Sequence, residues 1–236
     1  MIKIKSALIK FPLVFEAIQG LRNRRFHREG LRCGTFSQHG EDLRLLATLQ
    51  DADAKGPYLD VGCNHPFRLS NTYLLYQKGW RGLCIDPLPQ FRDAFQHWRP
   101  QDIFHCAAVG ETAIELPFFE FESDVLSTFD VNLADAYRAR GFRLLRKLMI
   151  PVVTIDSVLE FHGLTPPLSL LSLDIEGHEL SALRSINLQY WRPMFICMEA
   201  LTADGSRNET AIQYLLEQGY RPIVDMGLNI VYQKST

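Results

Sequence analysis

The stretch LLSLDIEGHEL, residues 170–180, joins a run of apolar residues to a group of titratable side chains. The apolar run ends at Asp174, and Glu176, Gly177 and His178 follow it closely. A buried strand that passes at once into a helix is typical of a parallel sheet covered by helices. The acidic residues either cap that helix, because acids favour helix N-termini, or perform chemistry at the end of the strand.

The same alternation of strand and helix patterns recurs along the chain on both sides of this stretch. It predicts an α/β fold with a doubly wound, mostly parallel sheet and helices on both faces. Two strand patterns within residues 221–234 surround a glycine-containing turn and predict an antiparallel hairpin at one edge of the sheet. The expected strands are 57–62, 81–87, 102–110, 168–177 and 194–200, and the expected helices are 70–80, 90–98, 178–186 and 208–220.

Composition and charge divide the chain into two parts. The 236 residues are 47% hydrophobic and 22% charged, as in an ordinary globular domain. Residues 1–36 carry eight basic and two acidic residues, whereas the remainder carries 17 basic and 25 acidic residues. The five cysteines form no Cys-x-x-Cys pair, which predicts reduced thiols in the cytoplasm rather than a disulfide framework or a zinc site.

Residues 1–35 are expected to form a basic, helical N-terminal extension, and residues 36–236 the main domain. The apolar positions of residues 4–18 recur at helical spacing among lysines, without a membrane-spanning run or a small-residue cleavage site. The favoured interpretation is a helix that packs on the domain, and the alternative is peripheral contact with the anionic inner face of a membrane. The basic cluster at 22–29 is interpreted as a solvated face, so no nucleic-acid partner is expected.

Two strand ends predict a nucleoside site, because ligands of doubly wound sheets bind outside the carboxyl ends of the strands. The first strand delivers Asp60 and Gly62 to that edge, and the second delivers Asp86, whose carboxylate can bind both ribose hydroxyls. The glycine pattern of dinucleotide sites and the P-loop pattern are both absent from the sequence. A ligand with a ribose and no phosphate fits better, and S-adenosylmethionine is such a ligand. Residues 106–110 would flank its adenine.

Five motifs follow one another along the chain: SQHGEDLRLL (37–46), YLDVGCNHPFRLSNTYLLYQKGWRGLCIDPLP (58–89), LSTFD (126–130), PVVTIDSVL (151–159) and LSLDIEGHELSAL (171–183). In this order they resemble the FkbM-type methyltransferases over residues 36–233. The resemblance implies the class I methyltransferase Rossmann-like fold, S-adenosylmethionine as donor, and transfer to an oxygen, usually of a sugar or polyketide hydroxyl. The turn Asp-x-Gly-x-Asn at 60–64 matches the variant of this family. The segment 112–167 interrupts the strand and helix alternation, and we expect it to cover the substrate side.

The strand ends and the resemblance together assign roles to individual residues. Asp174, Glu176 and His178 are the candidates for the base that removes the proton of an acceptor hydroxyl. Ser127 and Thr128, in the inserted segment, are expected to touch the substrate. A magnesium ion held by Asp174 and Glu176 is an open alternative, and no metal site is predicted. The expected cofactor-binding residues are Gln38, Asp60, Gly62, Asn64, Asp86, Ala107 and Asp174.

Three functions compete at this point. The leading one is an O-methyltransferase whose acceptor is a small molecule or glycan. The expected site of methylation is a sugar hydroxyl of a surface polysaccharide or of a glycosylated metabolite. The second is a non-catalytic nucleoside-binding or scaffold protein that retains the methyltransferase fold. The third is an NAD-dependent oxidoreductase, which the missing phosphate-loop glycines disfavour.

Overall fold

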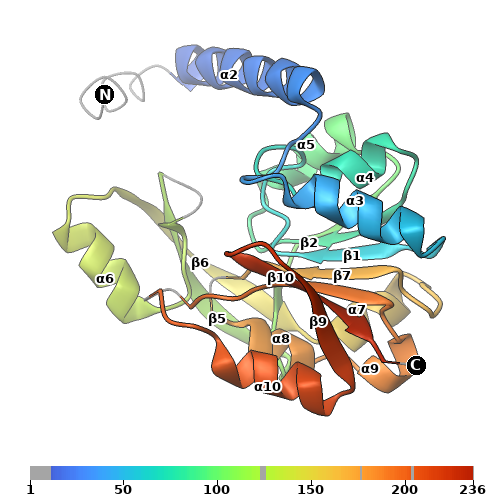
Figure 1. Cartoon of the computed structure of the whole chain (residues 1–236). Helices are drawn as coiled ribbons and strands as arrows, with labels where there is room; N and C mark the ends of the chain where they lie inside the picture. Colours follow the sequence, from blue (N-terminus) through green and yellow to red (C-terminus); the bar gives the residue numbers. More distant parts are fainter. Residues whose placement is uncertain (1–11, 123–125, 176, 203–204, 236) are drawn as a thin grey trace.

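A computed structural model of the chain describes residues 12–122, 126–175, 177–202 and 205–235. The strands of its central sheet are β1 (Tyr58–Val61), β2 (Gly82–Ile85), β3 (Ile103–His105), β7 (Leu170–Leu173), β8 (Phe195–Glu199), β9 (Tyr220–Asp225) and β10 (Asn229–Lys234). They lie in the order β3-β2-β1-β7-β8-β10-β9 (Figure 1). The first five strands of that order are parallel, and β10 pairs antiparallel with both β8 and β9. The expected doubly wound sheet with an antiparallel edge hairpin is therefore confirmed.

Helices cover both faces of this sheet (Figure 1). They are α2 (Pro12–Cys33), α3 (Glu41–Asp51), α4 (Tyr73–Gln77), α5 (Phe91–Trp98), α7 (Ile155–Phe161), α8 (Glu179–Arg184), α9 (Leu188–Trp191) and α10 (Glu209–Glu217). One buried cluster joins α3, α4 and α5 to the sheet, and a second joins α7, α8, α9 and α10 to the opposite face. No helix in the described part of the chain combines the length and apolarity needed to cross a membrane.

The buried strand β7 shows why the sequence of this region is so apolar. Leu171 and Leu173 belong to one buried cluster, whereas Leu170 belongs to the cluster on the opposite face of the sheet. Successive side chains of a strand point to opposite faces, so a strand covered on both sides needs apolar residues at consecutive positions. Charged side chains therefore appear only after the end of β7, where the chain is no longer buried between the two helix layers.

A second, smaller sheet comes largely from the segment that interrupts the alternation. It contains β4 (Ala108–Val109), β6 (Leu144–Val153) and β5 (Ile114–Phe121), in the order β4-β6-β5. Helix α6 (Val131–Ala139) connects β5 to β6 and stands beside them, away from α10 (Figure 1). Side chains of β5, of α6 and of residues 126–129, where Thr128 forms an isolated β-bridge with Phe119, line the cavity described below.

Two expected elements differ in extent from the structure. The expected strand 102–110 is divided, because the chain leaves β2 after His105 and then pairs β4 with β6 in the second sheet. The expected helix 70–80 is shortened to α4 at both ends. At its start, the Ser70 hydroxyl accepts hydrogen bonds from the amides of Thr72 and Tyr73, which makes a turn of these residues. At its end, Gly79 takes a left-handed conformation that terminates the helix.

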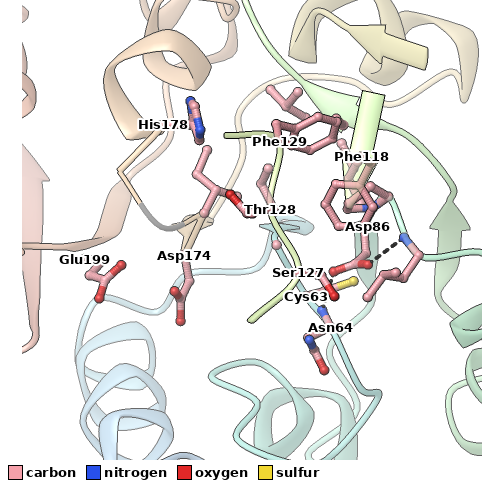
Figure 2. A pocket seen from close by; sticks show the side chains of 18 of the residues that line it. Cys63, Asn64, Asp86, Phe118, Ser127, Thr128, Phe129, Asp174, His178 and Glu199 are labelled. Carbon is pink, nitrogen blue, oxygen red and sulfur yellow. Dashed lines mark hydrogen bonds between the residues drawn. The ribbon is translucent and has the colours of Figure 1, made fainter. Parts of the chain in front are cut away.

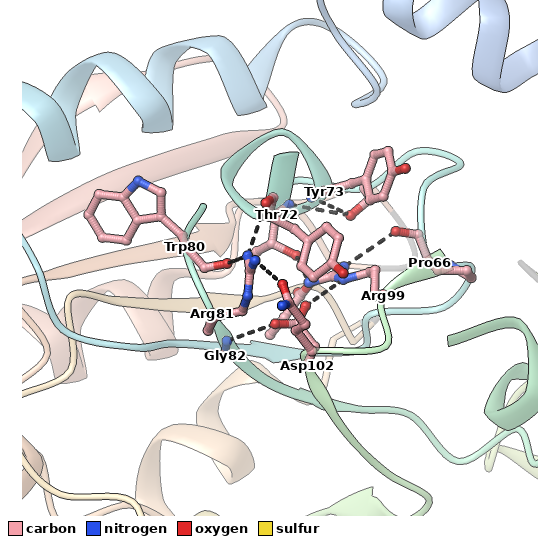
Figure 3. Close-up of polar contacts among 12 residues, drawn as sticks. Pro66, Thr72, Tyr73, Trp80, Arg81, Gly82, Arg99 and Asp102 are labelled. Carbon is pink, nitrogen blue, oxygen red and sulfur yellow. Dashed lines mark hydrogen bonds and ion pairs between the residues drawn. The ribbon is translucent and has the colours of Figure 1, made fainter. Parts of the chain in front are cut away.

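A buried polar network fastens the ends of β1 and α5 together (Figure 3). The Arg99 guanidinium donates to Asp102 Oδ2 at 2.7 Å, to the Tyr58 hydroxyl at 2.7 Å and to Thr72 Oγ1 at 3.0 Å. The Thr72 hydroxyl in turn donates to Asp60 at the end of β1. The Arg99 guanidinium and the Thr72 hydroxyl thus donate to acceptors inside the protein, as buried polar groups require.

Candidate functional site

A cavity of about 740 Å³ lies at the carboxyl edge of the parallel strands. Its volume is within the range of roughly 300–1,000 Å³ that small-molecule sites occupy. Its floor comes from the residues that follow β1, β2, β7 and β8, and its walls come from α2, α3 and the inserted segment. Of the residues predicted from the sequence, Gln38, Gly62, Asn64, Asp86, Ala107, Ser127, Thr128, Asp174 and His178 line this cavity.

The turn after β1 depends on Gly62, which has a left-handed φ of 79°. A Cβ atom at this position would lie 1.9 Å from the carbonyl oxygen of Asp174. The glycine is therefore required by the close approach of the β1 and β7 ends, where the Asp174 amide also donates to the Val61 carbonyl at 3.1 Å. This packing brings the turn at Gly62 and the predicted base Asp174 together at one wall of the cavity.

The Asp86 carboxylate is held in place from two sides. Its Oδ2 atom accepts a hydrogen bond from the Asn64 amide at 2.9 Å, and its Oδ1 atom accepts one from the Leu88 amide at 2.9 Å. Asn64 takes a left-handed φ of 46°, which turns its amide toward Asp86. The end of β2 and the turn after β1 are thus joined through this carboxylate, which faces the cavity opposite Asp174 (Figure 2).

Asp60 occupies a different position from the other predicted acids. Its side chain is buried and accepts a hydrogen bond from the Thr72 hydroxyl, and it is not among the residues that line the cavity. Burial raises the pKa of Asp60, and the nearby Arg99 guanidinium and the Thr72 hydrogen bond oppose that rise. The geometry therefore joins this carboxylate to the network beneath the cavity, and its contact with a cofactor stays a prediction.

The acidic residues that follow β7 have two different roles. Glu179, the first residue of α8, holds the turn before that helix, because its Oε1 atom accepts hydrogen bonds from the backbone amides of Ile175 at 3.2 Å and Gly177 at 3.1 Å. Asp174 and His178 line the cavity instead. Glu176 lies outside the described residues. Glu179 thus stabilises the turn between β7 and α8 rather than capping the helix, and Asp174 faces the cavity.

Ser127 and Thr128 bring the inserted segment to the cavity, and their hydroxyls also hold that segment together. The Ser127 hydroxyl accepts a hydrogen bond from the Phe121 amide at 3.1 Å, and Thr128 Oγ1 accepts one from the Asp130 amide at 3.1 Å. The Thr128 backbone pairs with Phe119 of β5 in both directions. This wall is therefore fixed by its own hydrogen bonds before any ligand enters.

Two polar residues that the sequence analysis did not predict lie beside Asp174. They are Glu199 and Asn229. Leu173 and Met198 are aligned in the β7–β8 pair, so Asp174 and Glu199 follow at neighbouring strand ends. Glu199 and Asn229 are themselves aligned in the β8–β10 pair. Glu199 was detectable, because it follows a parallel strand as Asp86 and Asp174 do. Asn229 begins an antiparallel strand, where that positional signal does not apply.

Helix α2 also contributes cavity residues that sequence reasoning missed. Arg22, Asn23 and Phe26 of this helix line the cavity. The helix is anchored by Phe26, which contacts Phe67, and by His27, whose Nε2 atom lies 2.9 Å from the Tyr73 hydroxyl. These residues lie outside the motifs that resemble the family, so no motif pointed to them.

Two polar atoms in the lining of the cavity have no hydrogen-bond partner in the described part of the chain. Glu41 Oε1 and Asn229 Oδ1 are buried cavity-lining atoms without such a partner among the described residues. Within the same residues, no three His, Cys, Asp or Glu side chains are arranged to hold a metal ion. The cavity is thus lined by buried hydrogen-bond acceptors that a ligand can satisfy.

Comparison with known proteins identifies the family of this chain. The "Methyltransferase FkbM domain" family matches residues 60–222. No curated protein matches the chain. A TehB-like SAM-dependent methyltransferase from Corynebacterium glutamicum is 14% identical, with 91% of this chain and 97% of that chain covered and a TM-score of 0.47. A candidate O-methyltransferase from Klebsiella pneumoniae is 12% identical, with 90% and 89% covered and a TM-score of 0.47. Because the family match spans more than half of its length, the chain belongs to the FkbM family of S-adenosylmethionine-dependent methyltransferases.

Proposed function

We propose that the protein transfers a methyl group from S-adenosylmethionine to a hydroxyl oxygen, with a sugar of a surface glycan or a glycosylated metabolite as acceptor. The observation that carries this proposal is the row of Asp174, Glu199 and Asn229 at three neighbouring strand ends. A hydroxyl group both donates and accepts hydrogen bonds, and so does an amide, whereas a carboxylate accepts the hydroxyl proton. The row supplies both kinds of partner.

The residues around the cavity suit the proposed donor. Glu41 and Asn229 present buried acceptor atoms that have no partner among the described residues. S-Adenosylmethionine carries a positive charge on its sulfur and another on its amino group, so a cavity with carboxylates in its lining favours it. When bound, it supplies a methyl group on a positively charged sulfur that leaves as a neutral thioether. In this proposal Asp86, whose carboxylate is ordered by two backbone amides, holds the ribose, and Ala107 flanks the adenine.

In this proposal Asp174 is the base. Its carboxylate lies beside that of Glu199 in Figure 2, and both belong to neighbouring strand ends. Asp174 takes the proton of the acceptor hydroxyl as the oxygen attacks, while Asn229 fixes the direction of that oxygen. Alignment of this kind supplies up to about 7–11 kcal/mol of a barrier in favourable cases. His178 is the second candidate, since it lines the same cavity at the start of α8.

The test is incubation of the full chain with S-adenosylmethionine labelled in its methyl group and a panel of glycans and glycosylated metabolites, with and without a chelator. The expected result is label in an ether-linked methyl group of at least one sugar. Mass spectrometry of the product locates the methylated atom. Binding of the donor without transfer to any member of the panel, or transfer to nitrogen or carbon alone, would contradict the proposed reaction.

Substitution Asp86→Asn is expected to weaken donor binding by roughly 10- to 100-fold, since a hydrogen bond to a charged group contributes about 1.5–3 kcal/mol. The neutral amide keeps the size of the carboxylate but loses its charge toward the ribose hydroxyls. Isothermal titration calorimetry measures the dissociation constant. Asp93→Asn, at an exposed position of α5, is the matched control and should bind as the parent does. An unchanged dissociation constant for the Asp86 variant would remove its ribose role.

The solvent face of α2 supports a further part of the proposal, peripheral contact with an anionic membrane. Its exposed positions recur at helical spacing, and Leu21 and Leu31 are 65% and 56% exposed. Basic side chains stand between these leucines, and the opposite face packs on the domain through Phe26. Exposed leucines among arginines suit a lipid surface, where each basic residue contributes about 1 kcal/mol. The basic residues of this face are Arg24, Arg25, Arg28 and Arg32.

Flotation with vesicles tests the membrane contact. The full chain is expected to float with phosphatidylglycerol-containing vesicles and to remain in solution with vesicles of phosphatidylcholine alone. The triple variant Arg24→Gln, Arg25→Gln, Arg28→Gln should lose most of this binding, and high salt should do the same. Equal behaviour of the two vesicle types, or of the variant and the parent, would rule the contact out.

A further inference from the structure

The side chain of Glu41 stands out among the buried acids of this protein. It begins α3, lines the cavity and is only 2% exposed. Its Oε2 atom accepts a hydrogen bond from the His39 amide at 2.8 Å. Its Oε1 atom has no hydrogen-bond partner among the described residues. One oxygen of this carboxylate is thus fixed by the chain, and the other is left for something in the cavity.

The neighbouring acid of α3, Asp42, has a structural role that Glu41 does not share. Asp42 is fully buried, and its two oxygens accept hydrogen bonds from the Phe36 amide at 2.7 Å and from the hydroxyls of Thr35 at 2.6 Å and Ser37 at 2.8 Å. Asp42 therefore holds the turn before α3 together. Since that task is filled, the turn does not explain why a second carboxylate is buried beside it.

The surroundings of Glu41 add negative charge. Asp174 and Glu199 line the same cavity as Glu41. Burial raises the pKa of the Cys197 thiol in β8, and the charges of Asp174, Glu41 and Asp60 raise it further. No Lys, Arg or His side chain of the described residues forms an ion pair with Glu41. A buried carboxylate without a charged partner costs several kcal/mol, so proteins normally supply one. A cationic group of a ligand meets that need.

We propose that Glu41 binds the α-ammonium group of S-adenosylmethionine and is a cofactor-binding residue of this protein. The inference rests on the proposed donor function. The ammonium is favoured over the sulfonium, because only the ammonium has N–H bonds to donate to the open oxygen. Position agrees as well: Asp86 after β2 and Glu41 at the start of α3 line the same cavity, as does Asp174 after β7. A ligand whose ribose meets Asp86 therefore extends its amino-acid end toward Glu41.

The test compares two ligands on the substitution Glu41→Gln by titration calorimetry. 5′-Methylthioadenosine keeps the adenosine and the sulfur of the donor but lacks the amino acid. Glu41→Gln should weaken S-adenosylmethionine binding by roughly 10- to 100-fold and change methylthioadenosine binding by less than about 2-fold. Asp51→Asn, at the exposed end of the same helix, is the matched control and should leave both affinities unchanged.

Thermal unfolding supplies a second readout that a structural role would not give. A buried carboxylate with an open oxygen destabilises the ligand-free protein, and a glutamine keeps one oxygen for the His39 amide without the charge. Glu41→Gln should therefore raise the melting temperature of the ligand-free protein and reduce the increase that S-adenosylmethionine produces. If this variant does not fold, Glu41→Asp is compared on the same two ligands. Aspartate keeps the charge, but its shorter side chain holds the carboxylate farther from the ligand, so this variant should lose affinity for the donor alone.

The outcomes separate this inference from the proposed function. Absence of donor binding by the parent chain would overturn the donor function itself and the role of Glu41 with it. Normal parent binding together with an unchanged affinity of the Glu41 variants would overturn the role of Glu41 alone. An equal loss for both ligands would also overturn it, because it would mean that Glu41 shapes the cavity rather than meeting the ammonium.

Discussion

Substitution Asp174→Asn is expected to lower kcat by about 10²- to 10⁴-fold, the usual contribution of a positioned base. Asparagine preserves the size of the side chain but cannot take up the hydroxyl proton. The backbone contacts of residue 174 with Val61 and Gly62 do not involve the side chain, so the turn should persist. The dissociation constant for S-adenosylmethionine should change far less than kcat, which separates the loss of a base from the loss of a binding site.

Transfer of labelled methyl at saturating donor measures this loss, and the dependence of kcat on pH identifies the base. The parent should lose activity as the pH falls and its base becomes protonated, and the variant should lack that limb of the profile. His178→Asn is measured in parallel as the competing candidate, and Asp51→Asn serves as the control. Parental turnover of the Asp174 variant, with a large loss in the His178 variant, would transfer the role to the histidine.

Substitution Arg99→Met should lower the free energy of unfolding by about 3–5 kcal/mol. Arg99 is fully buried and donates to Asp102, Tyr58 and Thr72. Methionine fills a similar volume but leaves the Asp102 carboxylate and the Tyr58 hydroxyl without this donor. Removing one partner of a buried pair strands the charge of the other, which costs far more than the pair itself contributes.

Urea unfolding followed by circular dichroism measures this effect. The exposed pair Arg138–Asp135, separated by 3.0 Å, is the matched comparison, and Arg138→Met should cost under about 1 kcal/mol. The double variant Arg99→Met, Asp102→Asn should be less unstable than the sum of its single changes, because it removes both charges together. A loss for Arg99→Met as small as that for Arg138→Met would mean that the buried network contributes little to stability.

Much of the fold could be predicted because strand and helix patterns depend on neighbours along the chain. The apolar run of β7 and the glycine at the end of α4 act over a few residues, and both are visible in the sequence. The positional rule that strand ends carry the ligand found Asp86 and Asp174, and both line the cavity. The division of 102–110 was missed because two strands of three and two residues in different sheets look like one apolar run.

The sequence by itself determined the class of fold and the edge of the sheet at which the cavity lies, since both follow from periodicity and from residues next to strand ends. Only the tertiary structure decided which acids face the cavity. Asp60 is bound to Thr72 beneath it, whereas Glu41 and Glu199 line it. The physical reason is that periodicity records whether a side chain is buried, but its partners are set by the packing of segments far apart in the chain. Whether a buried carboxylate serves stability or awaits a ligand depends on those partners.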